Sequence, residues 1–182
     1  YAESALVEPW ACVIAAYKLK YRTTLKAGGT TWIIGTDRAR DSYTISAGFE
    51  GSSHPDHLLL TNVPDLFRAW LMQRAGKLGI EVVEAADVDD PPVEQVDDIV
   101  MLGADADVVE QVSPRLAEHG VFAVVADELF ARKVSLDAGR IHYNNWVYIG
   151  GAGPDIGAVY AEHPVRTVLK PAGRACPQHA GF

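Results

Sequence analysis

The sequence predicts an α/β fold with a doubly wound, mainly parallel six-stranded sheet and helices on both of its faces. Six short apolar segments are bounded by glycine, proline or acidic residues, a pattern typical of strands buried on both faces. Amphipathic segments of helical period separate several of them, as in parallel sheets with right-handed crossovers. The chain has 182 residues, of which 48% are hydrophobic, and this is enough for one such domain with a buried core.

The expected strands are apolar runs that end in glycine, asparagine or aspartate. The first lies between the pair Gly28–Gly29 and Gly35, and its β-branched residues suit a central strand of the sheet. The six runs lie at residues 30–34, 57–63, 80–85, 98–103, 121–127 and 145–151.

Helices are expected at residues 9–19, 64–79 and 105–120. Pro9 and Pro64 stand at first-turn positions, and Gly79 ends the second helix, while Pro114 interrupts the third. Between the first two strands the chain has no apolar stripe of helical period. The first crossover helix is therefore expected to be short or missing.

The overall composition limits the function. A formal net charge of -8 and a pI near 5.1 argue against a nucleic-acid-binding surface. No apolar run approaches the roughly 18 to 20 residues that a membrane-spanning helix needs. Cys12 and Cys176 make neither a disulfide framework nor a zinc cluster, and the first residues do not resemble a signal peptide. We therefore expect a cytoplasmic protein and, since the chain opens at Tyr1, a fragment.

The turn after the first strand lacks the glycine-rich phosphate loop of dinucleotide-binding domains. In that loop glycines let the backbone approach a pyrophosphate at a helix amino terminus, but here only Gly35 is present. Thr36 and Asp37 could cap a short helix, and Arg38 or Arg40 could pair with a phosphate by charge. Alternatively, both arginines are solvated beside acidic neighbours, and Asp37 would repel a diphosphate.

The carboxyl ends of the other strands supply the remaining candidate binding residues, because ligands of such sheets lie beyond these ends. They are Asn62, Gly103, Ala126, Gly150 and Gly151. Asn62 stands where an acid would bond the adenosine ribose, which leaves the choice between NAD and NADP open. The loop "GGAGPDIG" at 150–157 has the spacing GxGxxxG and is interpreted as a tight connection, with phosphate contact as the alternative.

Other chemistry-bearing residues give weaker signals. His54 and His57 lie three apart in "HPDH", which favours a surface loop over a metal site because Asp56 is the one further ligand nearby. No serine has the strand-elbow context of a nucleophile. His142 and Tyr143 precede the last strand, and we expect them to pack against the helix layer without a catalytic role.

Four segments carry a family resemblance when they are taken in order: "EPWACVIAAY", "LKAGGTTWIIG", "DDIVMLGADADVVEQVSPRLAEHGVFAVVAD" and "VSLDAGRIHYNNWVYIGG". Their order and spacing resemble the nucleotide-binding half of medium-chain, zinc-type alcohol dehydrogenases, in the sugar-phosphate branch that includes sorbose phosphate reductase. The resemblance implies a Rossmann-like domain at residues 1–162 that binds NAD or NADP. The β-rich catalytic domain of that family has no counterpart here, so zinc is implied only for a full-length enzyme.

The resemblance also implies roles for Glu8 and for the last strand. Glu8 aligns with a glutamate that approaches the catalytic zinc in polyol-type members. One carboxylate cannot hold a catalytic zinc that needs three protein ligands, so in this chain alone Glu8 is a helix-start acid. Pairing of the edge strand "NWVYIGG" at 145–151 with a second copy would make a homodimer, as these dehydrogenases often do.

A phrase near the end of the chain repeats one that precedes the first strand. "RTTLKAGG" at 22–29 recurs as "RTVLKPAG" at 166–173, with Arg, Thr, Leu, Lys and the final Gly in common. Residues 163–182 are therefore expected to form a tail that starts a second, truncated Rossmann-like domain, with chance similarity as the alternative. Some members of the resembled branch carry two such folds, of which the second keeps the glycine fingerprint.

Two functional hypotheses follow from these observations. The first is the coenzyme domain of an NAD(P)-dependent alcohol or sugar-phosphate dehydrogenase, which would not be catalytic without its catalytic domain. The alternative is a degenerate Rossmann-like scaffold or dimerisation domain that binds no cofactor, which the missing glycines favour. A methyltransferase-like domain that binds S-adenosylmethionine is a weaker third, because it would need an acid where Asn62 stands.

Overall fold

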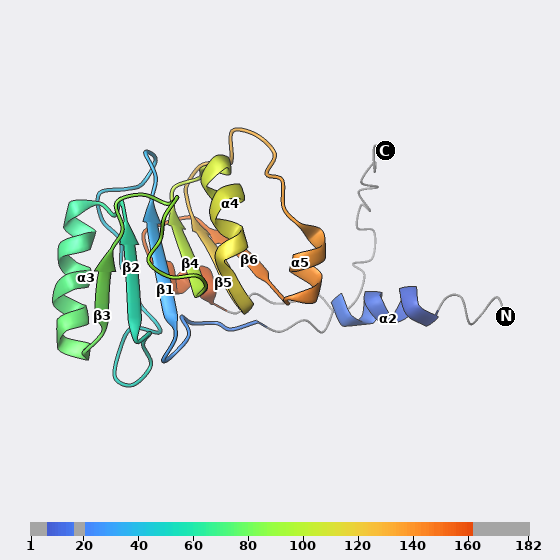
Figure 1. The fold of residues 1–182 in the computed structure, drawn as a ribbon, viewed down its shortest axis with the longest axis horizontal. Coiled ribbons are helices and arrows are strands. Elements are labelled where there is room, and N and C mark those ends of the chain that lie inside the picture. Colours follow the sequence, from blue (N-terminus) through green and yellow to red (C-terminus); the bar gives the residue numbers. More distant parts are fainter. Residues whose placement is uncertain (1–6, 17–20, 162–182) are drawn as a thin grey trace. The chain divides into compact units, whose positions relative to one another are not determined.

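The computed structural model of the chain describes residues 7–16 and 21–161, and residues 21–161 form one compact unit. Within this unit six strands form one sheet in which every neighbouring pair is parallel (Figure 1). Their order across the sheet is β3-β2-β1-β4-β5-β6. The strands are β1 (Thr30–Gly35), β2 (His57–Thr61), β3 (Glu81–Glu84), β4 (Val96–Leu102), β5 (Leu116–Val125) and β6 (Val147–Gly151). The predicted doubly wound parallel sheet is confirmed.

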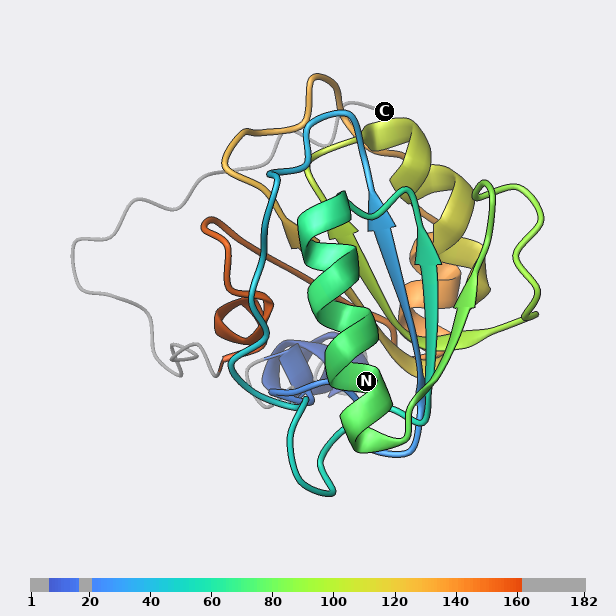
Figure 2. The same ribbon diagram turned by 90° about the vertical axis from the view of Figure 1, so that its left-hand side faces the viewer.

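Helices cover both faces of this sheet (Figure 2). They are α3 (Asp65–Leu78), α4 (Ala106–Val112), α5 (Ala138–Tyr143) and α6 (Ile156–Tyr160). On one face α3 and α6 bury Phe67 and Tyr160, and on the other face Val109 of α4 and Ile141 of α5 pack against the sheet. The helix α2 (Val7–Ala16) belongs to a separate unit. Of the helices in the described ranges 7–16 and 21–161, none has both the length and the apolar character to cross a membrane.

The connection between β1 and β2 contains no helix. All of residues 36–56 are described, and they run as an irregular segment between α3 and α6 (Figure 2). Tyr43 and Phe49 from this segment are 5% and 2% exposed, and the Tyr43 ring lies 5.5 Å from that of Phe67 in α3. These aromatic side chains fill the space that a crossover helix would cover. The expectation of a short or missing first crossover helix is confirmed.

The segment expected to be one helix at 105–120 is helical only in its first half. α4 ends at Val112, a 3-10 turn follows at Ser113–Arg115, and β5 begins at Leu116. Pro114 explains the early end, because proline has no backbone N–H to donate and its ring clashes with the preceding turn.

α5, directly before the last strand, is a second departure from the sequence prediction. Asp137 caps this helix by accepting a hydrogen bond from the backbone N–H of Arg140 at 3.1 Å. The expected packing of His142 and Tyr143 is wrong, because both side chains are exposed and that of Tyr143 is 78% exposed. The helix has only six residues, too few to show a periodic pattern in the sequence.

The segment at residues 22–29, which contains the repeated sequence, is hydrogen-bonded to the start of β4. Arg22 Nη1 donates to both carboxylate oxygens of Asp98, at 3.0 and 3.1 Å. Lys26 Nζ donates to Asp97 Oδ1 at 2.6 Å, and the Lys26 backbone N–H donates to Asp98 Oδ2 at 2.9 Å. The arginine and lysine that recur near the end of the chain are thus the residues that fix this entry into β1.

The second copy of the phrase, at 166–173, lies outside the described residues. The expected second domain that would start in residues 163–182 therefore stays a prediction.

Candidate functional site

The predicted binding residues lie at one edge of the sheet, its carboxyl edge, because all its strands run in the same direction (Figure 1). Gly35 ends β1, Gly150 and Gly151 end β6, and Asn62, Gly103 and Ala126 follow β2, β4 and β5. β1 and β4 are neighbours in the sheet, yet the chain leaves them toward opposite faces. This is a topological switch point, the place where open α/β sheets bind ligands.

Gly35 and Asn62 form the first part of this edge. A Cβ atom on Gly35 would lie 2.0 Å from the backbone oxygen of Asn62, so only glycine permits this approach. Asn62 has a φ of 52°, a conformation that asparagine adopts more readily than most residues. Its side chain is exposed, and its amide can bond a hydroxyl group.

Residues 36–42, which we call the strap, lie across the end of β4. The backbone N–H and the Oγ1 of Thr36 both donate to the backbone oxygen of Leu102, at 3.0 and 2.9 Å. A Cβ atom on Gly103 would lie 2.3 Å from Thr36 Oγ1. The short helix that Thr36 and Asp37 were expected to cap is not formed, because the strap continues as an irregular segment.

The strap bonds most of its own backbone amides. The N–H groups of Arg38 and Ala39 donate to Thr36, at 3.2 Å to Oγ1 and 2.9 Å to the backbone oxygen. The N–H of Arg40 donates to the Tyr43 hydroxyl at 2.8 Å. A pyrophosphate site of the usual kind needs a row of free amides at a helix amino terminus. Among these described residues, the turn after β1 supplies neither.

The two arginines of the strap both have partners within the chain. Arg40 pairs with Asp127, which follows β5, and the hydrogen bond from Arg40 lowers the pKa of Asp127 below its usual range. Arg38 Nη1 reaches the backbone oxygen of Ala104 at 3.4 Å. Arg40 is therefore paired with a carboxylate, and the partner is not one of its sequence neighbours.

An apolar groove of about 530 Å³ lies at the ends of β5 and β6. Ala126, Gly150 and Gly151 line it, so the structure brings three of the predicted residues together there. Its apolar walls also include Val109, Leu129, Phe130, Val134, Leu136 and Tyr148. A concave surface of this composition suits a flat and largely apolar ring.

Arg132 holds one wall of the groove against α4. Its guanidinium pairs with Asp107 and, at 2.6 Å, with Glu110. The backbone N–H of Ser135 donates to the same Glu110 Oε1 at 2.6 Å. The hydrogen bond from Arg132, with that of Ser135, lowers the pKa of Glu110 to about 2. The loop after β5 is thus fixed by these charged contacts as well as by Phe130, Val134 and Leu136, which are partly buried against the core.

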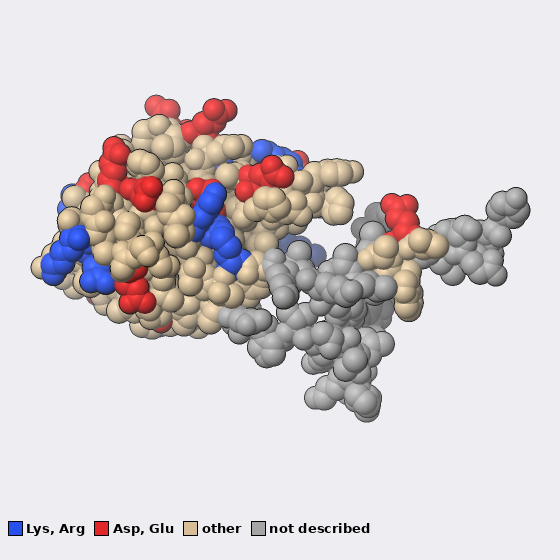
Figure 3. Space-filling model, turned by 90° about the horizontal axis from the view of Figure 1, so that it is seen from below, with Lys and Arg blue, Asp and Glu red and all other residues tan. Residues whose placement is uncertain are grey.

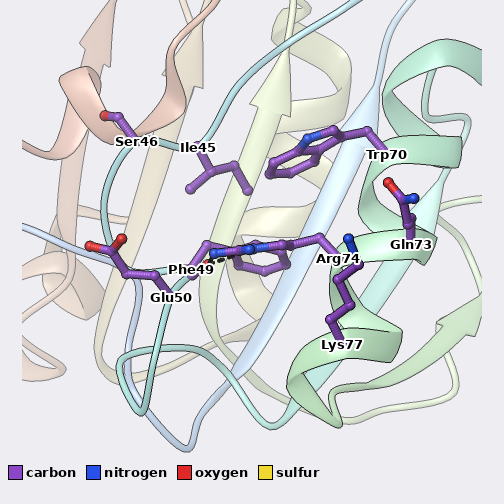
Figure 4. A pocket seen from close by; sticks show the side chains of 8 residues that line it. All are labelled: Ile45, Ser46, Phe49, Glu50, Trp70, Gln73, Arg74 and Lys77. Carbon is purple, nitrogen blue, oxygen red and sulfur yellow. Dashed lines mark hydrogen bonds between the residues drawn. The ribbon is translucent and has the colours of Figure 1, made fainter.

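A second hollow, of about 180 Å³, lies beside α3 (Figure 4). It is lined by Ile45, Ser46, Phe49, Glu50, Trp70, Gln73, Arg74 and Lys77. Arg74 reaches across it and donates to the backbone oxygen of Phe49, at 3.3 Å from Nε and 3.2 Å from Nη2. Since none of the predicted site residues lines this hollow, it is separate from the candidate site.

The expected metal role of Glu8 stays a prediction. Glu8 lies in the first turn of α2, in the unit apart from the sheet. In the part of the chain that the structure describes, no three His, Cys, Asp or Glu side chains are grouped to hold a metal. His54 Nδ1 lies 2.8 Å from the backbone oxygen of Pro55, and His57 Nδ1 lies 3.2 Å from Glu81 Oε2.

The carboxyl edge fits one part of a dinucleotide and does not fit another. The groove matches a flat ring, and the exposed Asn62 amide matches a ribose hydroxyl. With the strap in place, however, the diphosphate position beside Gly35 is filled by Thr36 and the residues bonded to it.

Sequence reasoning missed the contacts that build this edge. Nothing in the local pattern indicates that Arg40 meets Asp127, because the two are joined only when β1 and β5 take their places in the sheet. The one usable signal was the lack of a helical stripe after β1, which indicates an irregular segment but not its course.

Comparisons with known proteins find dehydrogenases. No family model matches the chain. A mannitol-1-phosphate 5-dehydrogenase from Aliivibrio fischeri is 27% identical over 184 aligned positions, which cover 86% of this chain and 43% of that enzyme. The chain thus spans less than half the length of this relative. The resemblance to dehydrogenases that the sequence indicates is confirmed.

Two solved structures are also similar. Benzyl alcohol dehydrogenase from Acinetobacter calcoaceticus has a TM-score of 0.47 and 12% identity, covering 75% of this chain and 37% of its own. Glucose dehydrogenase from Haloferax mediterranei, solved in complex with NADP, Zn and gluconolactone, has a TM-score of 0.44 and 16% identity, covering 87% of this chain and 44% of its own.

Proposed function

We propose that this chain is the coenzyme-binding domain of an NAD(P)-dependent dehydrogenase that acts on an alcohol or a sugar phosphate. The observation that carries the proposal is the sequence similarity to mannitol-1-phosphate 5-dehydrogenase, which covers 86% of the chain. The strand order supports it, because its switch point between β1 and β4 is where such sheets bind ligands. The expected small-molecule partner is NAD or NADP.

In this proposal the carboxyl edge binds and orients the coenzyme. The apolar groove takes the ring end, where Ala126, Gly150 and Gly151 leave space for a flat group. The exposed amide of Asn62 takes a ribose hydroxyl. A nicotinamide coenzyme supplies or accepts the hydride in such enzymes, and the catalytic groups, zinc included, belong to the rest of the enzyme. The isolated chain is not expected to catalyse the reaction.

The proposal includes a cytoplasmic location and a homodimer. The two cysteines fit a reducing compartment. Among the described strands β6 has a neighbour on one side only, and its free edge can pair with that of a second copy. The net charge of -8 favours a small-molecule partner over a nucleic acid. On the face drawn in Figure 3, basic side chains lie in small groups among acidic ones.

A scaffold domain without a coenzyme is the second candidate, and one observation favours it. The strap lies on the end of β4, and most of its amides are bonded within the chain. A fold that keeps its sheet only to hold neighbouring domains would not need that position free.

Calorimetric titration of the chain with NADH and NADPH distinguishes the two candidates, with S-adenosylmethionine as a third ligand. The dehydrogenase proposal expects saturable binding of at least one nicotinamide coenzyme. Ala126→Leu should weaken it about tenfold, because the larger side chain would occupy groove space that the ring needs, and such overpacking costs about 1–3 kcal/mol. Gly76→Ala, in α3 and with no atom within 4 Å of the new Cβ, is the control and should bind like the parent. Absence of measurable binding of both NADH and NADPH would favour the scaffold candidate.

A further inference from the structure

Gly103, at the end of β4, leaves room for the strap. A Cβ atom there would lie 2.3 Å from Thr36 Oγ1, 2.7 Å from the carbonyl carbon of Arg38 and 2.9 Å from the backbone nitrogen of Ala39. Real Cβ atoms essentially never come so close to a neighbour. The absence of a side chain at Gly103 therefore lets the strap pack directly against the end of β4. A larger residue at this position would push the strap away.

The strap lies in the place of a diphosphate. In dinucleotide-binding sheets the pyrophosphate lies against the first turn after β1, at the switch point. Here that turn bonds to the backbone oxygen of Leu102 through the backbone N–H and the hydroxyl of Thr36. The strap and a diphosphate cannot both occupy this position, so binding requires the strap to leave it.

The strap is held by contacts that can break without disturbing the core. None of its residues is buried, whereas Tyr43, which follows it, is 5% exposed. The ion pair between Arg40 and Asp127 has side chains that are 44% and 45% exposed. Exposed pairs of this kind contribute little to stability. Gly35 in β1 and the packed Tyr43 thus form two fixed ends between which the strap can lift.

We infer that the strap is a cover over the coenzyme site, latched by Arg40 and Asp127, and that a dinucleotide binds only when it has lifted. The inference rests on the proposed function and adds a regulatory device to the same site. The apparent affinity for the coenzyme is then the intrinsic affinity reduced by the small open fraction. A change that weakens the latch raises that fraction and tightens binding.

The test compares three variants of the chain by calorimetric titration with NADH and NADPH and by hydrogen exchange of the amides of residues 36–42. Arg40→Ala removes the latch, and Thr36→Ala removes the hydroxyl that bonds Leu102 and Arg38. Arg68→Ala is the matched control, because it removes an equally charged and exposed pair with Glu84. Both strap variants should exchange faster and bind the coenzyme about two- to fivefold tighter, while the control stays unchanged.

Each other outcome has a distinct meaning. Weaker binding by Arg40→Ala would show that this arginine holds a phosphate, which overturns the cover and leaves the proposed function standing. Unchanged coenzyme affinity despite faster amide exchange of the strap would also contradict the inference that the strap covers the site, and would leave the proposed function standing. Absence of binding in the parent chain and in both strap variants would overturn the proposed function and the cover together.

Discussion

Asp98 is a charged side chain buried in the sheet, and its partners come from two separate segments of the chain, residues 22–26 and α6. It is 0% exposed and accepts hydrogen bonds from Arg22, from the backbone of Lys26 and, at 3.0 Å, from the Tyr160 hydroxyl. Burial raises the pKa of Asp98, and Arg22 opposes that rise. Burial also raises the pKa of Tyr160, and the Asp98 carboxylate adds to the rise. One carboxylate therefore joins the entry into β1 to the last helix.

Replacing Asp98 should strongly destabilise the domain. We expect Asp98→Ala to lower the free energy of unfolding by about 3–5 kcal/mol, because it leaves the groups that face it without a partner. Asp98→Asn should cost less, since it keeps an acceptor of similar shape. Urea denaturation measures both, with the exposed Glu94→Gln as the control. Equal stability of Asp98→Ala and the parent chain would contradict the role given to this carboxylate.

Glu110 gives the domain a pH dependence that can be predicted in sign. Its pKa is about 2 in the folded chain against 4.5 ordinarily, because Arg132 and the Ser135 N–H bond the charged form. A depressed pKa contributes stability above pH 4.5, and the contribution is lost as the pH falls from 4.5 toward 2. Arg132→Ala should return the pKa of Glu110 toward 4.5 in a carboxyl NMR titration. An unchanged titration curve would show that Arg132 is not the cause.

At the scale of elements, one glycine inside α3 and one at its C-cap should respond in opposite ways to the same substitution. Gly76 lies inside the helix, with nothing within 4 Å of an added Cβ, whereas Gly79 is the C-cap with a φ of 74°. Gly76→Ala should raise the free energy of unfolding by about 0.5–1 kcal/mol, because alanine favours helix. Gly79→Ala should lower it by about 1 kcal/mol, because the left-handed conformation strains a side chain. Thermal or urea unfolding of the pair tests this, and effects of the same sign would be inconsistent with the helix end described.

The strands could be predicted from the sequence because a strand that is buried on both faces has consecutive apolar residues. β1, β2 and β4 each contain an unbroken apolar run, at residues 32–34, 58–60 and 99–102, and the buried positions of these runs follow from that. The helices were predicted less well, since Pro114 ends α4 early and α5 is too short to show a period. Periodicity indicates that an element exists more reliably than where it ends.

The candidate site could be predicted only in part. Parallel strands alone bring Gly35, Gly103 and Gly151 to one edge, and this followed from the order of elements. The course of the strap could not be predicted from the sequence. Arg40 and Asp127 are far apart in the sequence and come into contact only in the assembled sheet.

At the scale of the whole molecule, the free edge of β6 predicts a dimer that one substitution should break. The Gly151 carbonyl accepts from the Ala126 N–H at 3.1 Å, so it faces β5, and the alternation along a strand turns the Gly150 N–H to the free edge. Gly150→Pro removes that donor at an edge position where proline is tolerated. Sedimentation velocity should show the parent chain as a dimer and this variant as a monomer. Persistence of the dimer in Gly150→Pro would rule out this edge as the interface.

The central claim is that the carboxyl edge of the sheet is a coenzyme site partly covered by the strap. The most direct test is to map amide chemical shifts while the chain is titrated with NADH and then with NADPH. The account predicts that the amides of Ala126, Gly150 and Gly151 shift together with those of residues 36–42. Shifts confined to the hollow beside α3, around Trp70 and Arg74, or no shifts with either coenzyme, would contradict it.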